Sequence, residues 1–156
     1  MTRLLQIGEP APPFSLLNQE GKQKANADYA GKWLVLYFYP KDNTPGCTTE
    51  AINFTELKRK FSSRQAAIVG ISPDSVASHQ KFIEKKNLKI ELLSDTEKKA
   101  AQAFGVWQLK KMAGREYMGV VRSTFLISPE GDIVQIWNSV KVKGHAETVL
   151  NELCNL

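Results

Sequence analysis

The sequence predicts an α/β fold with a central sheet flanked by helices. Two near-continuous apolar runs, "KWLVLYFYP" (32–40) and "AAIVGIS" (66–72), have the composition of strands that are buried on both faces. The segment between them carries apolar residues at helical spacing, namely Ile52, Phe54, Leu57 and Phe61. Strand, helix and strand in this order indicate a right-handed βαβ unit.

The next part of the chain predicts two more helices. The stretch "SPDSVASHQKFIEKKN" (72–87) opens with residues that commonly cap helices. The stretch "SDTEKKAAQAFG" (94–105) places Ser94 and Glu97 at the spacing of a capping box, and Gly105 supplies a stop signal. We expect a helix in each stretch.

The last third predicts a hairpin and a final helix. The runs "VVRSTFLI" (120–127) and "IVQIW" (133–137) flank the turn sequence "SPEGD", as two antiparallel strands do. The segment "GHAETVLNELCNL" (144–156) has an apolar stripe at Ala146, Val149, Leu150 and Leu153. The complete order of elements is that of a thioredoxin-like fold behind a Pro- and Gly-rich N-terminal arm, and 156 residues suffice for one such domain, 1–156.

Composition and charge exclude several classes of protein. The chain is 42% hydrophobic and 24% charged, and it has no apolar run approaching the ~20 residues of a membrane helix. Its net charge of +5 is spread over separate helical faces and a loop with Lys110, Lys111 and Arg115, without interleaved aromatic residues. We therefore expect no nucleic acid and no membrane partner. The start "MTRLLQIGEPAPPFSLL" lacks the apolar core of a secretory signal, so we expect a cytoplasmic protein.

One of the two cysteines lies at an unusual break in "YPKDNTPGCTTEA" (39–51). Cys47 falls in the first turn of the predicted helix, where free backbone N–H groups and the helix dipole favour a thiolate over a thiol. The alternative is a buried and inert cysteine. Thr44, with Pro45 at the first helical position, is placed to cap the helix by accepting a hydrogen bond from the Cys47 N–H, and Pro40 ends the preceding strand.

The same stretch resembles the peroxiredoxins, in particular the Q-type or bacterioferritin-comigratory-protein group. The resemblance lies in the Pro-x-x-x-Thr-x-x-Cys spacing of Pro40, Thr44 and Cys47, and it continues in "GISPDSVASHQKF" and "YMGVVRSTFLISPEGDI" over nearly the whole chain. It implies a thioredoxin-like fold of the peroxiredoxin type with a central mixed sheet. It also implies thiol-dependent reduction of hydrogen peroxide and organic hydroperoxides, with Cys47 passing through a sulfenic acid.

The resemblance assigns roles to further residues. It implies that Thr44 hydrogen-bonds the peroxide, that Pro40 shields the sulfur, and that Arg122 of "VRSTF" is the active-site arginine. Glu50, one turn after Cys47, is either a partner that orients Arg122 or an exposed carboxylate at the helix start.

Re-reduction of the oxidised cysteine has two alternatives. Many Q-type members have a resolving cysteine five residues after the first, where this chain has Ile52. Cys154 is then a possible resolving residue or a packing residue. We favour re-reduction by an external small thiol, glutaredoxin or thioredoxin. The resemblance also favours a monomer, and the residues themselves indicate no cofactor and no metal site.

Rival functions have less support in the sequence. A disulfide oxidoreductase of the thioredoxin kind requires Cys-x-x-Cys, whereas Cys47 is followed by Thr48, Thr49 and Glu50. A cysteine hydrolase requires a base, but His79 and His145 have no sequence relation to Cys47 and we interpret each as a surface histidine. Metal-ligand pairs and a complete phosphate loop are absent from the sequence. The remaining alternative is a peroxiredoxin-like binding protein, such as a redox sensor or chaperone, that has lost turnover.

Overall fold

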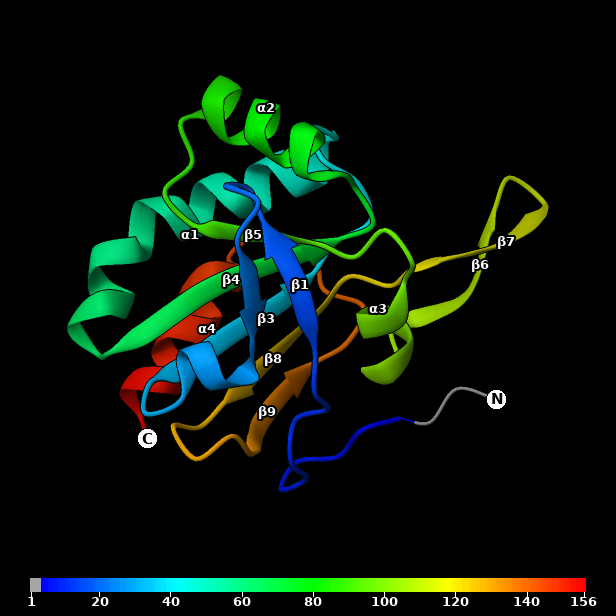
Figure 1. Cartoon of the computed structure of the whole chain (residues 1–156). Coiled ribbons are helices and arrows are strands. Elements are labelled where there is room, and N and C mark those ends of the chain that lie inside the picture. Colours follow the sequence, from blue (N-terminus) through cyan, green and yellow to red (C-terminus); the bar gives the residue numbers. More distant parts are fainter. Residues whose placement is uncertain (1–3) are drawn as a thin grey trace.

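A mixed sheet forms the centre of the computed structural model, which describes residues 4–156 (Figure 1). Its strand order is β2-β1-β5-β4-β3-β8-β9. These strands are β1 (Ser15–Asn18), β2 (Gln23–Ala25), β3 (Trp33–Phe38), β4 (Ala66–Ser72), β5 (Glu91–Ser94), β8 (Ser123–Ile127) and β9 (Ile133–Trp137). Strands β3, β4 and β5 run parallel, whereas β8, β9, β1 and β2 pair antiparallel with their neighbours. The central mixed sheet predicted from the sequence is confirmed.

Strand β3 lies in the middle of the sheet, as its apolar sequence predicts. It pairs with β4 from Trp33↔Ala66 to Phe38↔Ile71 and with β8 from Leu34↔Ile127 to Phe38↔Ser123. Because both of its edges and both of its faces are covered, its residues after Trp33 are all buried. The predicted hairpin of β8 and β9 is also confirmed.

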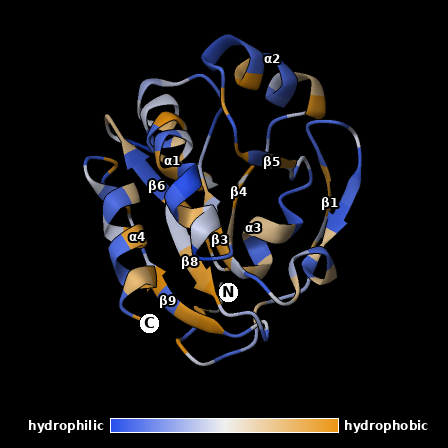
Figure 2. Ribbon diagram, turned by 90° about the vertical axis from the view of Figure 1, so that its left-hand side faces the viewer, coloured by the Kyte–Doolittle hydropathy of each residue, from blue (hydrophilic) through white to orange (hydrophobic). Residues whose placement is uncertain are grey.

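Helices cover both faces of the sheet (Figure 2). Helices α1 (Pro45–Ser63), α2 (Val76–Lys86) and α4 (His145–Cys154) share a core with alternate residues of β3, including Val35 and Tyr37. Helix α3 (Lys99–Ala103) and the short 3-10 helix η1 (Asn26–Tyr29) pack on the opposite face, with Leu34 and Leu36. None of the helices in the described part of the chain is both long and apolar enough to cross a membrane.

Two strands were expected to be a loop, and that expectation is wrong. Lys110 and Lys111 lie in β6 (Trp107–Met112), and Arg115 begins β7 (Arg115–Val120). The two strands pair only with each other and project from the body of the molecule (Figure 1). Since large apolar and charged side chains of this hairpin are exposed on both faces, the sequence has no inside-outside alternation to indicate strands.

The helix expected over 94–105 is shorter than predicted and has a different cap. Ser94 belongs to β5, where it pairs with Ser72 of β4, so it does not form the expected capping box with Glu97. Lys98 takes a left-handed conformation with φ 59 before the helix begins. The carboxylate of Asp95 instead accepts hydrogen bonds from the N–H groups of Ala100 and Ala101. Sheet pairing therefore takes precedence over the local capping signal.

Candidate active site

The turn between β3 and α1 places Cys47 just beyond the carboxyl end of the central strand β3. After Phe38 the Tyr39 N–H still donates to Ile71 O (3.0 Å), and the half-buried Pro40 then starts a loop of residues 40–44. Thr44 occupies the N-cap position with extended backbone, and Pro45 is the first helical residue. The predicted helix start is confirmed, so Cys47 lies where unpaired N–H groups favour an anion.

Arg122 reaches the sulfur of Cys47 from a neighbouring strand. The pairing Phe38↔Ser123 sets the start of β8 beside the end of β3, and Arg122 immediately precedes this pair. Its Nη2 donates a hydrogen bond to Cys47 Sγ at 3.2 Å. Cys47 is 1% exposed, so the sulfur meets this cation in a nearly closed site. The register of the sheet, rather than nearness in sequence, therefore brings the two residues together.

Glu50 is a buried partner of Arg122 and not an exposed carboxylate. Arg122 Nη1 donates to Glu50 Oε1 at 2.6 Å, and the Glu50 side chain is 1% exposed. Burial raises the pKa of Glu50 from 4.5 to about 7, while the charge and hydrogen bond of Arg122 oppose the rise. Burial also lowers the pKa of Arg122, but the negative charges of Glu50 and Cys47 raise it above its ordinary value. The Glu50 carboxylate thus fixes the guanidinium beside the sulfur.

The Thr44 hydroxyl does not make the expected capping bond. Thr44 is the N-cap residue, but its side chain accepts no hydrogen bond from the helix. Its Oγ1 instead donates to Lys41 O at 2.9 Å, within the loop, while the Thr44 backbone O accepts from the Thr48 N–H at 2.8 Å. The hydroxyl thus stabilises the turn of the loop, and Thr44 lies three residues before Cys47.

Two residues near the sulfur were not identified from the sequence. A Cβ at Gly46 would lie 3.2 Å from Arg122 Nη2, so the missing side chain leaves room for the guanidinium. Tyr37 of β3 is fully buried, and burial followed by the negative charges of Glu50 and Cys47 raises its pKa. Within residues 4–156, Tyr37 Oη and Glu50 Oε2 are buried without a hydrogen-bond partner. The Pro-Gly pair was the one sequence signal for Gly46.

Both histidines are buried, so their interpretation as surface residues is wrong. His145, at the start of α4, has its Nε2 2.7 Å from Thr124 Oγ1, and burial followed by the charge of Arg122 lowers its pKa to about 4. His79 in α2 contacts Asp42 of the loop before α1. In the described part of the chain, neither histidine hydrogen-bonds to Cys47, so a cysteine–histidine pair for hydrolysis is not formed.

Cys154 differs from Cys47 in its exposure and in its place in the fold. It is an exposed free thiol in the last turn of α4, whereas Cys47 is a buried free thiol. His145 lies in the first turn of the same helix, and the charge of Arg122 lowers its pKa, so this end of α4 is the one near Arg122. At 1.5 Å per residue, Cys154 is roughly 13 Å further along the helix axis.

These contacts define the chemistry that the site can perform. A buried sulfur at a helix N-terminus, held against a guanidinium, is suited to attack an electrophilic atom while fixed donors stabilise charge on the group that leaves. Neither cysteine forms a disulfide within residues 4–156. The site is therefore built around one nucleophile.

Several known proteins are similar to this chain over most of its length. The sequence model of the AhpC/TSA family matches residues 7–136. Peroxiredoxin Bcp of Bacillus subtilis (strain 168) is 51% identical over 149 residues, which cover 96% of this chain and 95% of the relative. Peroxiredoxin Bcp of Xanthomonas campestris is 49% identical over 141 residues, covering 90% of this chain and 87% of that one.

Solved structures of related proteins match the fold of this chain. A mutant of PrxQ from Xylella fastidiosa has a TM-score of 0.93 and 41% sequence identity, with 98% of each chain covered. The bacterioferritin comigratory protein of Xanthomonas campestris, studied for alkyl peroxide reduction through trapped intermediate and ligand complexes, has a TM-score of 0.87 and 46% identity. That match covers 91% of this chain and 90% of the other.

Proposed function

This chain belongs to the AhpC/TSA family as a peroxiredoxin of the Bcp and PrxQ group, a thiol-dependent peroxidase, and from that premise we propose that Cys47 is its peroxidatic residue. The observation that carries the proposal is the contact of 3.2 Å between Arg122 Nη2 and Cys47 Sγ. Cys47 alone of the two cysteines combines a helix N-terminus with a neighbouring cation. An exposed thiol such as Cys154 has neither feature.

The first half of the reaction is a displacement at oxygen. The Cys47 thiolate attacks one oxygen of the peroxide, a new S–O bond forms, and the O–O bond breaks. Negative charge moves from sulfur to the departing oxygen, which takes up a proton and leaves as water or an alcohol, while Cys47 becomes a sulfenic acid. Because Arg122 is fixed by Glu50, its donors stabilise the developing charge without reorganisation.

Thr44 and Pro40 complete the proposed site. The Thr44 hydroxyl, which donates to Lys41 O in this structure, would turn to donate to a bound peroxide oxygen. Pro40, half-buried at the start of the loop of residues 40–44, would shield the sulfur and exclude water from it. Together with Cys47 and Arg122, these residues form the catalytic set that we propose, and Glu50 acts through Arg122.

We propose that an external thiol completes the cycle. Ile52, the position five residues after Cys47, is partly buried against the core, and Cys154 lies at the far end of α4. A small thiol, glutaredoxin or thioredoxin would attack the sulfenic acid, release water and form a mixed disulfide, which a second thiol reduces. We further propose a single domain, 1–156, since both cores pack on one sheet. We also propose that it acts as a monomer in the reducing cytoplasm.

A peroxide-consumption assay tests this function. The protein is supplied in turn with dithiothreitol, glutathione with glutaredoxin, or thioredoxin with its reductase, and with hydrogen peroxide or an alkyl hydroperoxide. We expect turnover in the parent protein and none in Cys47→Ser. Consumption of peroxide by Cys47→Ser at the parent rate would refute the assignment, and a folded parent protein without turnover would favour a binding protein.

A further inference from the structure

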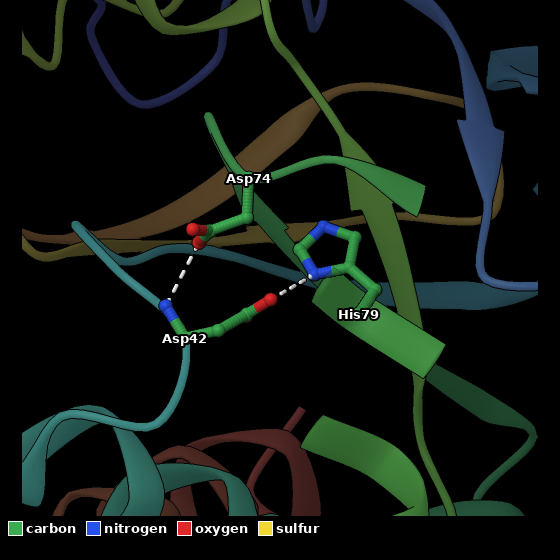
Figure 3. A group of neighbouring side chains, drawn as sticks. All are labelled: Asp42, Asp74 and His79. Atoms are coloured by element: carbon green, nitrogen blue, oxygen red, sulfur yellow. Dashed lines mark hydrogen bonds and ion pairs between the residues drawn. The ribbon is translucent and has the colours of Figure 1, made fainter. Parts of the chain in front are cut away.

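We propose that Asp42 and His79 are positioning residues that hold the loop of residues 40–44 over Cys47. The inference rests on the proposed function, because this loop carries Pro40 and Thr44. Neither Asp42 nor His79 touches the sulfur, so their effect on the reaction passes through the loop. The pair lies on the side of the loop that faces α2 (Figure 3).

Within the described residues, Asp42 makes every side-chain hydrogen bond between this loop and α2, and between this loop and the segment that precedes α2. Its N–H donates to Asp74 Oδ2 at 2.8 Å. Its carboxylate accepts from Ser78 Oγ at 2.8 Å and from Tyr39 Oη at 2.6 Å, and lies 2.7 Å from His79 Nδ1. The other loop contact, Thr44 Oγ1 to Lys41 O, is internal. One aspartate therefore anchors the whole turn.

The surroundings of His79 fix the state of this pair. His79 is 0% exposed, and its Nε2 lies 3.0 Å from Leu93 O, which can only accept, so Nε2 carries a proton. Nδ1 faces the Asp42 carboxylate, which already accepts from two hydroxyl groups. A proton must therefore lie between Nδ1 and Oδ2, and the pair forms a buried charge-assisted hydrogen bond. Such bonds are short and directional, as an anchor for a loop requires.

The same residues have the composition of a metal site, but their atoms are already engaged. Asp42, Asp74 and His79 bring ligand atoms within 4.8 Å of one another (Figure 3). Asp74 Oδ2 accepts from the Asp42 N–H and from Ser72 Oγ. Asp42 and His79 are bonded to each other. Protein donors thus account for the cluster, and an anchoring role explains its geometry without an ion.

Loss of the anchor should affect two reactions of Cys47 in opposite ways. Reaction with peroxide needs Pro40 and Thr44 in place, and a misplacement of about 1 Å can cost a hundredfold in rate. Alkylation by iodoacetamide needs only a reactive and accessible sulfur. Because Cys47 is 1% exposed and closely follows this loop in the first turn of α1, a looser loop should admit this reagent more readily. A general loss of stability also exposes the sulfur to alkylation, so both rates must be compared with those of a destabilised variant whose loop contacts are intact.

The experiment measures both rates in single turnovers followed by mass spectrometry. For Asp42→Ala we expect the peroxide rate to fall about a hundredfold, while alkylation stays equal or becomes faster. Asp42→Asn should recover most of the peroxide rate, because its amide can accept from Tyr39 and donate to a neutral His79. Asp74→Ala loosens the loop without disturbing the buried pair, and we expect a roughly tenfold fall.

A matched control separates anchoring from stability. Leu88→Ala removes a buried side chain that lies nine residues after His79, beyond the end of α2, so it should destabilise the fold and leave the peroxide rate unchanged. If Asp42→Ala does not fold, Asp74→Ala carries the test. Peroxide rates equal to the parent in folded Asp42→Ala or Asp74→Ala, or an equal fall in both reactions, would overturn the anchoring role. A parent protein inert to peroxide would instead contradict the proposed function.

Discussion

Cys47 and Cys154 are the two free thiols of one chain, and they occupy opposite helix ends. Cys47 lies buried in the first turn of α1, where the helix dipole favours negative charge, and a guanidinium donates to its sulfur. Cys154 lies exposed in the last turn of α4, where the dipole disfavours negative charge, and no hydrogen bond reaches its sulfur in the described structure. If Cys47 is the nucleophile, as we propose, the surroundings of a cysteine, rather than its presence, define that role.

Removing Arg122 should make Cys47 behave more like Cys154, and it has the largest expected effect. Arg122→Ala deletes the donor to the sulfur, and one preorganised donor at such a site is worth about 3 kcal/mol, or roughly 10²-fold in rate. Stopped-flow measurement of the peroxide reaction checks this. Arg115→Ala, on the exposed β7, is the matched control. A parent rate in Arg122→Ala would remove that residue from the site.

The pH dependence tests the partner of Arg122. Because the pKa of Glu50 is raised to about 7, its carboxylate takes up a proton as the pH falls through that value and loses its hold on Arg122. We expect the peroxide rate to fall below about pH 7, and Glu50→Gln to be slower by roughly tenfold and to lack this limb. An identical limb in Glu50→Gln would assign it to another group.

The same raised pKa has a consequence for stability. Between 4.5 and about 7 the folded protein binds the Glu50 proton more tightly than the unfolded chain does. The contribution of Glu50 to the free energy of unfolding is therefore greatest below pH 4.5, and it decreases as the pH rises through about 7. Urea unfolding of the parent and of Glu50→Gln across this range should show the decrease only in the parent. A parallel course of the two curves would contradict it.

Gly46 tests how closely Arg122 must approach the sulfur. In Gly46→Ala the new Cβ would lie 3.2 Å from Nη2, so the guanidinium must shift by a few tenths of an ångström. We expect the peroxide rate to fall severalfold, up to about tenfold, with little change in the melting temperature. Thr49→Ala, an exposed position in the same turn, is the control. An unchanged rate would show that the site tolerates a displaced guanidinium.

Cys154 should have the smallest effect. Because it is exposed at the end of α4 away from Arg122, Cys154→Ser should keep the parent turnover with each external reductant. Non-reducing gels and mass spectrometry after oxidation measure whether it pairs with Cys47. A rapidly formed Cys47–Cys154 disulfide, with lost turnover in Cys154→Ser, would make it the resolving residue.

Long, strongly patterned elements of the fold could be predicted from the sequence, whereas short or unburied ones could not. Strand β3 is an apolar run because both of its faces are buried, and α1 has apolar residues at helical spacing because one stripe of it is buried. Strand β5 has only the four residues Glu91–Ser94, and the β6–β7 hairpin buries only its end at Trp107 and Val120, so neither leaves a period in the sequence. Tertiary pairing creates these strands, and local sequence does not report it.

The site divides in the same way. Cys47, Thr44 and Pro40 lie in one contiguous motif, and the resemblance added Arg122, which the sheet register then brings to the sulfur. The burial of Glu50 and the pairing of His79 with Asp42 depend on contacts across the fold, which a histidine in a polar stretch does not indicate. Contacts between distant residues therefore set the part of the site that sequence reasoning missed.

Mass spectrometry of the intact protein after one equivalent of hydrogen peroxide tests the central claim most directly. The two cysteines are then mapped by peptide analysis after trapping the sulfenic acid with dimedone. We predict that the dimedone adduct, which forms a C–S bond as the sulfenic oxygen leaves as water, is found on Cys47 alone, with Cys154 still alkylated as a free thiol. Oxidation that falls first on Cys154, or equally on both cysteines, would contradict the view that the surroundings of Cys47 make it the nucleophile.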